Sequence, residues 1–119
     1  MSLKVEVRDS LFDPHSSDRR VLVRRTPEDR PLYRVFLYLE GPDLPFVESV
    51  TYVLHPTFPD PIRVVPRTPS NPLCKLEIWT WGLFDVAVTV TEKSGARFRL
   101  AHHLEYEDEA LRQREVSFV

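Results

Sequence analysis

The chain contains little glycine and almost no cysteine. Its 119 residues include three glycines, Gly41, Gly82 and Gly95, and a single cysteine, Cys74. Glycines this far apart cannot form the glycine-rich loop that binds phosphates at a helix N-terminus. One cysteine forms neither an internal disulfide nor a cysteine-based zinc site, a pattern compatible with a reducing compartment. We therefore expect no cofactor and no structural metal.

The sequence also lacks a strong net charge and a long apolar run. Sixteen Lys and Arg residues against eighteen Asp and Glu residues give a formal net charge of −2, which would not attract nucleic acid or an anionic membrane. No apolar run reaches the roughly 18 residues of a membrane span, and no signal-peptide pattern opens the chain. A chain of this length fits one domain. We expect a single cytoplasmic domain over residues 1–119 that binds neither nucleic acid nor membrane.

In several segments of the sequence, every second residue is apolar, a pattern that is typical of half-buried β-strands. Phe84, Val86, Val88 and Val90 would share one face of a strand, and a second alternating run follows at 97–104. The residues between the two runs, EKSG, end in a glycine that can take positive φ. The two runs therefore predict a β-hairpin.

Further segments carry strand patterns, although less regular ones. They lie at 3–7, 20–23, 33–39, 45–54, 73–80 and 115–119. Seven to eight strands separated by proline-, aspartate- or asparagine-rich turns predict an all-β fold, an immunoglobulin-like antiparallel β-sandwich. Residues 107–115 predict a solvated turn or a short helical piece. The prolines within 56–72 predict rigid connections between strands.

Candidate catalytic and metal-binding side chains are few. His102 and His103 are neighbours in a predicted strand, so their side chains would point to opposite faces and cannot bind one ion together. One histidine in the core and the other exposed to solvent fits this pattern better than a shared metal site does. Cys74 alternates with Leu76 and Ile78, which predicts a buried, unreactive thiol. We expect no catalytic activity.

Two aromatic residues fall in predicted loops. The stretch LHPTFPDP, residues 54–61, places three prolines around Phe58, and because each proline fixes φ near about −65° and lacks a backbone donor, it predicts a stiff loop. Phe58 is then either packed into the core beneath the loop or held outward for a ligand. Trp81 precedes Gly82, whose backbone freedom permits an unusual φ or a close approach at a corner between strands.

These loops belong to a longer pattern. The stretch VTYVLHPTFPDPIRVV at 50–65 combines a strand ending in Leu-His, a hydroxyl residue, Phe and Pro-x-Pro. WGLF at 81–84 and a hairpin ending in HHLEY at 102–106 follow it. In this order, over roughly residues 33–106, the chain resembles the YEATS domain, and most closely its prokaryotic branch.

The resemblance implies an immunoglobulin-like sandwich that acts as a binding module without enzymatic activity. Eukaryotic YEATS domains read acylated lysine on histone tails by placing the flat acyl amide between two aromatic rings. By this resemblance, Phe58 and Trp81 would be the two rings. His55 and Thr57 would line the pocket, with the Thr57 hydroxyl in place of a serine that often hydrogen-bonds the amide.

The segment around the second ring would complete the pocket. Backbone groups at Trp81 and Gly82 would meet the amide, and Thr80 stands where the family typically has glycine. An acylated lysine has lost its charge, so it can enter an apolar slot if its N–H and C=O find partners. The resemblance thus implies an acylated protein or peptide, or a small amide-like ligand, as the partner.

Two other functions remain open from the sequence. The first is a protein–protein interaction domain that has no acyl pocket and docks a partner through its loops or a sheet edge. The second is an enzyme that holds a metal ion at His55, His102 or His103. Inward packing of both loop aromatics would favour the first, and additional metal ligands would favour the second.

Overall fold

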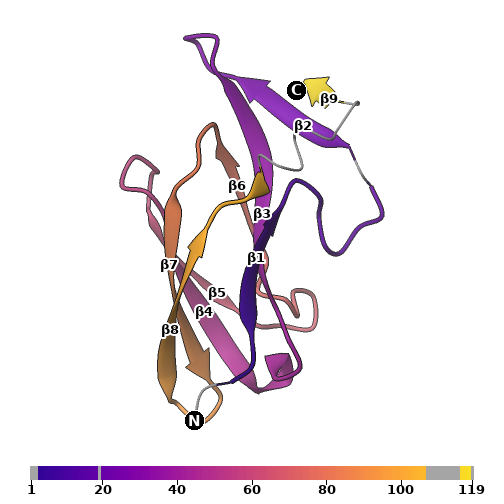
Figure 1. Cartoon of the computed structure of the whole chain (residues 1–119). Helices are drawn as coiled ribbons and strands as arrows, with labels where there is room; N and C mark the ends of the chain where they lie inside the picture. The colour runs from indigo at the N-terminus through magenta and orange to yellow at the C-terminus, as the bar shows by residue number, and fades with distance from the viewer. Residues whose placement is uncertain (1–2, 19, 107–115, 119) are drawn as a thin grey trace.

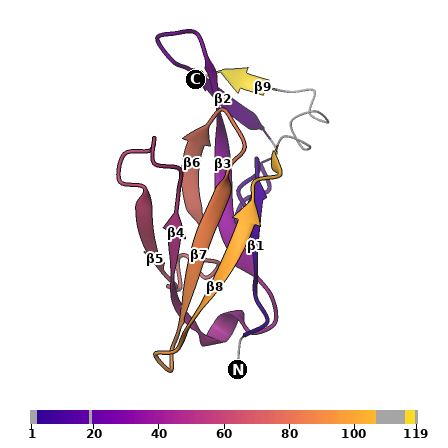
Figure 2. The same ribbon diagram turned by 60° about the vertical axis from the view of Figure 1, so that its left-hand side comes forward.

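The computed structural model describes residues 3–18, 20–106 and 116–118, and nearly all of its regular structure is β-strand (Figure 1). Two sheets pack face to face, and Figure 2 shows them from the side of the smaller sheet. The predicted turn or helical piece at 107–115 lies outside the described residues. No helix within the described ranges is long and apolar enough to span a membrane.

The first sheet is organised around β3 (Pro31–Glu40). Three strands pair with β3 in antiparallel orientation: β1 (Glu6–Ser10), β2 (Val21–Arg25) and β6 (Leu76–Thr80). Tyr33 pairs with both β2 and β6, so these strands lie on opposite edges of β3. β9 (Val116–Phe118) pairs with β2 in parallel orientation, which differs from the predicted all-antiparallel pairing.

The second sheet has four antiparallel strands. In spatial order they are β5 (Ile62–Pro66), β4 (Val47–Val53), β7 (Asp85–Glu92) and β8 (Arg97–His103). β7 and β8 form the predicted hairpin, and Gly95 takes a φ of 92° in its turn. The β7 valines at alternating positions are buried between the sheets, as the period of two predicts.

Two polar groups in the core between the sheets form a hydrogen bond with each other. The phenol of Tyr52, a fully buried side chain of β4, donates a hydrogen bond to the carbonyl oxygen of Cys74 at 2.8 Å. Cys74 itself is fully buried, as predicted, and burial raises the pKa of its thiol to about 11. At neutral pH the thiol therefore stays protonated, which disfavours reactivity as a nucleophile.

A buried carboxylate links the two sheets along one edge. The Asp9 side chain on β1 has no exposed surface, and its Oδ1 lies 2.6 Å from Nε2 of His102 on β8. His103 points to the other face and pairs with Asp85 at 2.7 Å. The predicted contrast between an inward and an outward histidine is confirmed. Among the residues that the structure describes, no three His, Cys, Asp or Glu side chains gather in a way that would hold a metal ion.

The predicted immunoglobulin-like β-sandwich is confirmed, with differences in individual strands. The structure describes nine strands because residues 62–66, expected as a rigid connection, form β5. Proline is tolerated there because β5 is an edge strand and its only proline, Pro66, is the last residue. The strand predicted at 45–54 is shorter, since the short 3-10 turn η1 (Leu44–Phe46) precedes β4.

Candidate functional site

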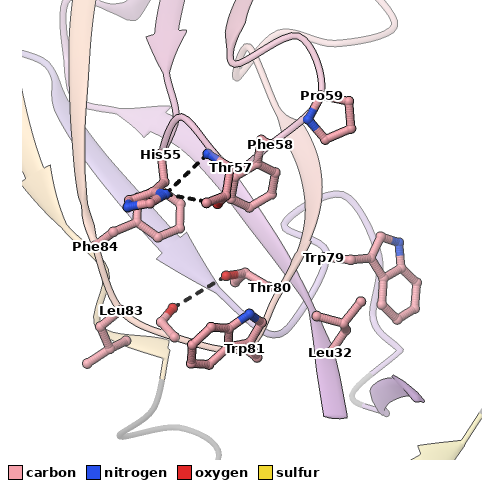
Figure 3. Close-up of a pocket in the computed structure, with 11 residues that line it drawn as sticks. Leu32, His55, Thr57, Phe58, Pro59, Trp79, Thr80, Trp81, Leu83 and Phe84 are labelled. Carbon is pink, nitrogen blue, oxygen red and sulfur yellow. Dashed lines mark hydrogen bonds between the residues drawn. The ribbon is translucent and has the colours of Figure 1, made fainter. Parts of the chain in front are cut away.

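A pocket of about 590 Å³ lies where two connections meet at one end of the sandwich. These connections are residues 54–61, between β4 and β5, and residues 81–84, between β6 and β7 (Figures 1 and 3). All six residues predicted for the site line this pocket: His55, Thr57, Phe58, Thr80, Trp81 and Gly82. Five further residues line it: Leu32, Pro59, Trp79, Leu83 and Phe84.

The first connection is a stiff hairpin loop, as its prolines predict. The Leu54 N–H donates to the Pro61 carbonyl at 2.8 Å, which closes the base of the loop next to the last pair of β4 and β5. Inside it, the Phe58 N–H donates to the His55 carbonyl at 3.0 Å. The Arg63 guanidinium donates from Nη2 to the Pro59 carbonyl at 2.8 Å. These bonds fix the loop from inside and from its flank, so Phe58 is held in one position.

His55 and Thr57 form a polar pair at the wall of the pocket. The Thr57 backbone N–H donates to Nδ1 of His55 at 3.3 Å, so Nδ1 acts as an acceptor. The Thr57 hydroxyl lies 2.8 Å from the same nitrogen and therefore donates its proton to it. This arrangement leaves the lone pairs of the hydroxyl oxygen available to a donor from a ligand.

The sequence left open whether Phe58 packs into the core or faces a pocket, and in the structure it does both. Its side chain is half-buried and packs against the core cluster, yet it also lines the pocket. The ring of Phe84 lies 5.5 Å from the Phe58 ring, with 52° between the planes, and His55 contacts Phe84 edge-on at 6.0 Å. Phe84 thus supports both residues of the first connection. Sequence reasoning placed Phe84 only at the start of a strand, although it ends the WGLF motif.

Trp81 is the second predicted ring, and it is exposed. The residue is 58% accessible, and Figure 3 shows its indole across the pocket from Phe58, with Thr80 between them in this view. The guanidinium of Arg30 lies 4.1 Å from the centre of the Trp81 ring. Arg30 does not line the pocket. Arg30 therefore contacts the indole without belonging to the lining of the pocket.

Gly82 is held by its carbonyl rather than by a special backbone conformation. The Thr80 hydroxyl donates to this carbonyl at 3.4 Å, and the Tyr106 phenol donates to it at 3.1 Å. Gly82 adopts neither the positive φ nor the close approach that a glycine permits. Its φ is not positive, and a Cβ built there would meet no atom within 4 Å.

Tyr106 is a supporting residue that sequence reasoning did not identify. Its backbone N–H donates to Oδ2 of the buried Asp9 at 2.8 Å, and its ring lies 5.9 Å from that of Tyr33. Through Tyr106, the Trp81 connection is tied to β1 and β3. Tyr106 does belong to the HHLEY motif, but nothing in the sequence indicates which carbonyl its phenol would contact.

The lining of the pocket is neutral and largely aromatic. None of the described residues that line it is an aspartate, glutamate, lysine or arginine, and four are Phe or Trp. A cationic guest would find no carboxylate to replace its lost hydration, and an anionic guest would find no cation inside. The pocket therefore suits an uncharged, flat group that makes a few hydrogen bonds.

The sequence matches the prokaryotic YEATS domain over residues 33–105. Transcription initiation factor TFIID subunit 14 of Schizosaccharomyces pombe, a curated protein, is 32% identical over 71 residues. The match covers 59% of this chain but only 28% of that protein, so the chain spans less than a third of this relative's length.

Solved structures show the same fold at low sequence identity. The Yaf9 YEATS domain recognizing an H3K122suc peptide has a TM-score of 0.58 at 19% identity, covering 92% of this chain and 80% of that one. The yeast AF-9 homolog protein Yaf9 gives a TM-score of 0.55 at 18% identity, covering 86% of this chain and 69% of that one. The Yaf9 YEATS domain bound to H3K27ac has a TM-score of 0.54 at 18% identity, covering 88% of this chain and 76% of that one.

The family match includes both connections that form the pocket and the strands that carry them. It covers well over half of the chain, and the two-sheet architecture agrees with the solved YEATS domains. The chain belongs to the prokaryotic YEATS domain family.

Proposed function

We propose that this chain is a non-enzymatic reader that binds an acylated lysine, or a similar flat neutral amide, between Phe58 and Trp81. The observation that carries the proposal is the uncharged pocket of about 590 Å³ whose two loops present these rings. Its family supports a binding role, since Yaf9 YEATS domains have been solved with an H3K122suc peptide and with H3K27ac. The partner of this chain would be an acylated protein or peptide.

The charge of the guest decides which form of lysine fits. A free lysine ammonium would lose its hydration and meet no carboxylate in the lining, and attraction to the aromatic faces would offset only part of that cost. Acylation removes the charge and creates a planar amide. Each ring that stacks on this amide contributes about 0.5–1.5 kcal/mol beyond the burial of its area. The pocket should therefore discriminate strongly between acylated and unmodified lysine.

The amide also needs hydrogen-bond partners, because leaving one of its polar groups unpaired costs about 1–3 kcal/mol. The Thr57 hydroxyl donates to His55, so its oxygen is free to accept the amide N–H of the ligand. A backbone N–H in the Thr80–Trp81–Gly82 segment would donate to the acyl oxygen. Because the prolines and internal hydrogen bonds already fix the first loop, little conformational entropy would be lost on binding.

The exposure of Trp81 argues against the alternative of a docking domain without a pocket. That alternative expects Phe58 and Trp81 to be packed inward, whereas Trp81 is 58% accessible and both residues line the pocket. Isothermal titration calorimetry with acetyl-lysine, crotonyl-lysine and unmodified lysine peptides of one sequence tests the proposal. We expect heat of binding with the acylated peptides alone. Equal binding of all three, or none with either acylated form, would overturn it.

A further inference from the structure

Two arginines stack on the tryptophans of the pocket from outside its lining. The Arg30 guanidinium lies 4.1 Å from the centre of the Trp81 ring, and the Arg24 guanidinium lies 4.2 Å from that of Trp79. Both tryptophans line the pocket, and neither arginine does. Both arginine side chains are exposed to solvent. Two positive charges therefore lie against the tryptophans that line the pocket.

These two cations have no carboxylate partner within the described part of the chain. Neighbouring arginines do: Arg25 pairs with Asp29 at 3.1 Å, and Arg34 lies 3.9 Å from Glu77. Among the ion pairs formed by described residues, none includes Arg24 or Arg30.

The local charge differs in sign from that of the whole chain. Residues 21–34, which form the β2–β3 hairpin and the start of β3, hold four arginines and two carboxylates, an excess of two positive charges. The complete chain carries a net charge of −2. This hairpin, whose Arg24 and Arg30 contact the tryptophans of the pocket, is thus a locally positive segment of a slightly acidic protein, which would orient a charged partner as it approaches.

The stacked geometry leaves the arginines able to bind anions. A ring face offers a guanidinium no hydrogen-bond acceptor of the carboxylate kind, so N–H groups of Arg24 and Arg30 are left for another partner. Those N–H groups match a carboxylate, which can accept two of them at once. The indoles hold the guanidiniums in place, so a carboxylate that binds them immobilises little additional side-chain freedom.

We propose that the segment inserted into this pocket is acidic, and that carboxylates flanking the inserted residue bind Arg24 and Arg30. This inference rests on the proposed function, and it specifies the partner of the same site. The arginines lie outside the pocket, so they would meet residues on either side of the acyl-lysine rather than the acyl group itself. A lysine-rich segment around the same acyl-lysine would be repelled.

The test uses fluorescein-labelled peptides of equal length that carry a central crotonyl-lysine flanked by Glu, Ser or Lys residues. A fourth peptide has Glu flanks and an unmodified lysine. Fluorescence anisotropy gives Kd for the wild type, the Arg24→Gln, Arg30→Gln double variant, and Arg99→Gln. Arg99 is an exposed residue of β8 in the other sheet, so its variant is a control that removes the same charge elsewhere.

The expected order of affinity is Glu flanks, then Ser flanks, then Lys flanks. Exposed ion pairs predict a gain of about two- to fivefold per arginine, which weakens as salt rises. The double variant should bring the Glu-flanked peptide close to the Ser-flanked value, while Arg99→Gln leaves the order unchanged. Thermal melts of both variants check folding, and the single substitutions provide a second measurement if the double variant melts early.

The outcomes separate this inference from the proposed function. If the three crotonyl peptides bind equally well, or if the double variant keeps the preference for Glu flanks, the acidic-segment proposal is wrong and the reader function stands. If the unmodified Glu peptide binds as tightly as its crotonyl form and loses affinity in the double variant, the acyl-lysine function is wrong and the binding of an acidic segment by Arg24 and Arg30 is supported. Absence of binding by both Glu-flanked peptides overturns both.

Discussion

The phenol of Tyr106 donates a hydrogen bond to the carbonyl oxygen of Gly82 at 3.1 Å, and this bond joins the second pocket connection to the body of the sandwich. Tyr106 is itself anchored by its N–H, which bonds the buried carboxylate of Asp9 at 2.8 Å. The exposed Trp81 immediately precedes Gly82, so the position of its ring depends on a contact formed by Tyr106, which lies 24 positions from Gly82 in the chain.

Removing the Tyr106 hydroxyl tests this dependence. In Tyr106→Phe, the Gly82 carbonyl keeps only the longer 3.4 Å bond from Thr80. We expect a loss of about 1 kcal/mol in the free energy of unfolding, the typical contribution of one hydrogen bond, and weaker binding of a crotonyl-lysine peptide because the Trp81 connection is less fixed. Urea denaturation and calorimetry measure the two effects.

Tyr33→Phe is the matched control for that substitution. It removes a hydroxyl from the neighbouring ring, and this hydroxyl forms no hydrogen bond with another described residue. Peptide affinity should stay at the wild-type value in the control. If both variants bind equally well, the bond to Gly82 does not position the site.

Trp81→Ala should remove binding and leave the fold stable. The residue is 58% exposed, so loss of its side chain should change the free energy of unfolding by no more than about 0.5 kcal/mol. Affinity for a crotonyl-lysine peptide should fall at least about tenfold, since stacking and apolar contact on one side of the guest are lost. Phe46→Ala deletes an aromatic ring of similar exposure, 57%, from η1 and should leave affinity unchanged.

Phe58→Ala should affect both stability and binding, in contrast to Trp81→Ala. Phe58 is half-buried, packs on the core cluster and contacts Phe84 at 5.5 Å. Truncation should cost about 1–3 kcal/mol of unfolding free energy, below the cost for a fully buried phenylalanine. Phe58→Leu should recover most of the stability but not the affinity, because it restores apolar volume without a flat ring. Recovery of both would show that Phe58 contributes only packing.

The sequence predicts the architecture well because each strand carries its own pattern. The alternating β7 and β8 runs and the glycine of their turn fold as expected. β5 was missed because the surrounding prolines exclude a central strand, while an edge strand accepts a proline at its end. Its apolar residues also do not mark a buried face, since Ile62 and Val64 are exposed.

The candidate site is partly visible in the sequence, since motif order identifies six residues that line one pocket. The motifs do not predict which distant segments contact one another. Trp79 and Leu32 line the pocket from the first sheet, Arg30 stacks on Trp81, and Tyr106 bonds Gly82. Each of these contacts depends on how the strands pair in space, which residue types alone do not specify.

The buried thiol of Cys74 gives the fold a dependence on pH at alkaline values. Its pKa is about 11 in the folded chain because burial disfavours the thiolate, against an ordinary value of 9.0. The folded state thus binds more protons than the unfolded state between these values, so stability falls as the pH rises through this window. Urea denaturation at pH 8 and pH 10.5 should show a larger loss for the wild type than for Cys74→Ala. Equal losses in the two proteins would contradict this account.

The same burial predicts slow modification of the thiol. An alkylating reagent such as iodoacetamide should leave Cys74 unmodified in the folded protein at pH 8 and modify it fully in urea, as followed by intact mass. Rapid alkylation without denaturant would mean that the region around Cys74 opens readily.

Proton NMR of a crotonyl-lysine peptide tests most directly whether the guest lies between Phe58 and Trp81. Protons above the face of an aromatic ring are shielded by its π electrons, so the crotonyl methyl resonance should move upfield when the wild type is added. It should move far less with Trp81→Ala or Phe58→Leu. A peptide that binds with no upfield shift, or with the same shift in wild type and both variants, would contradict the placement of the acyl group between the two rings.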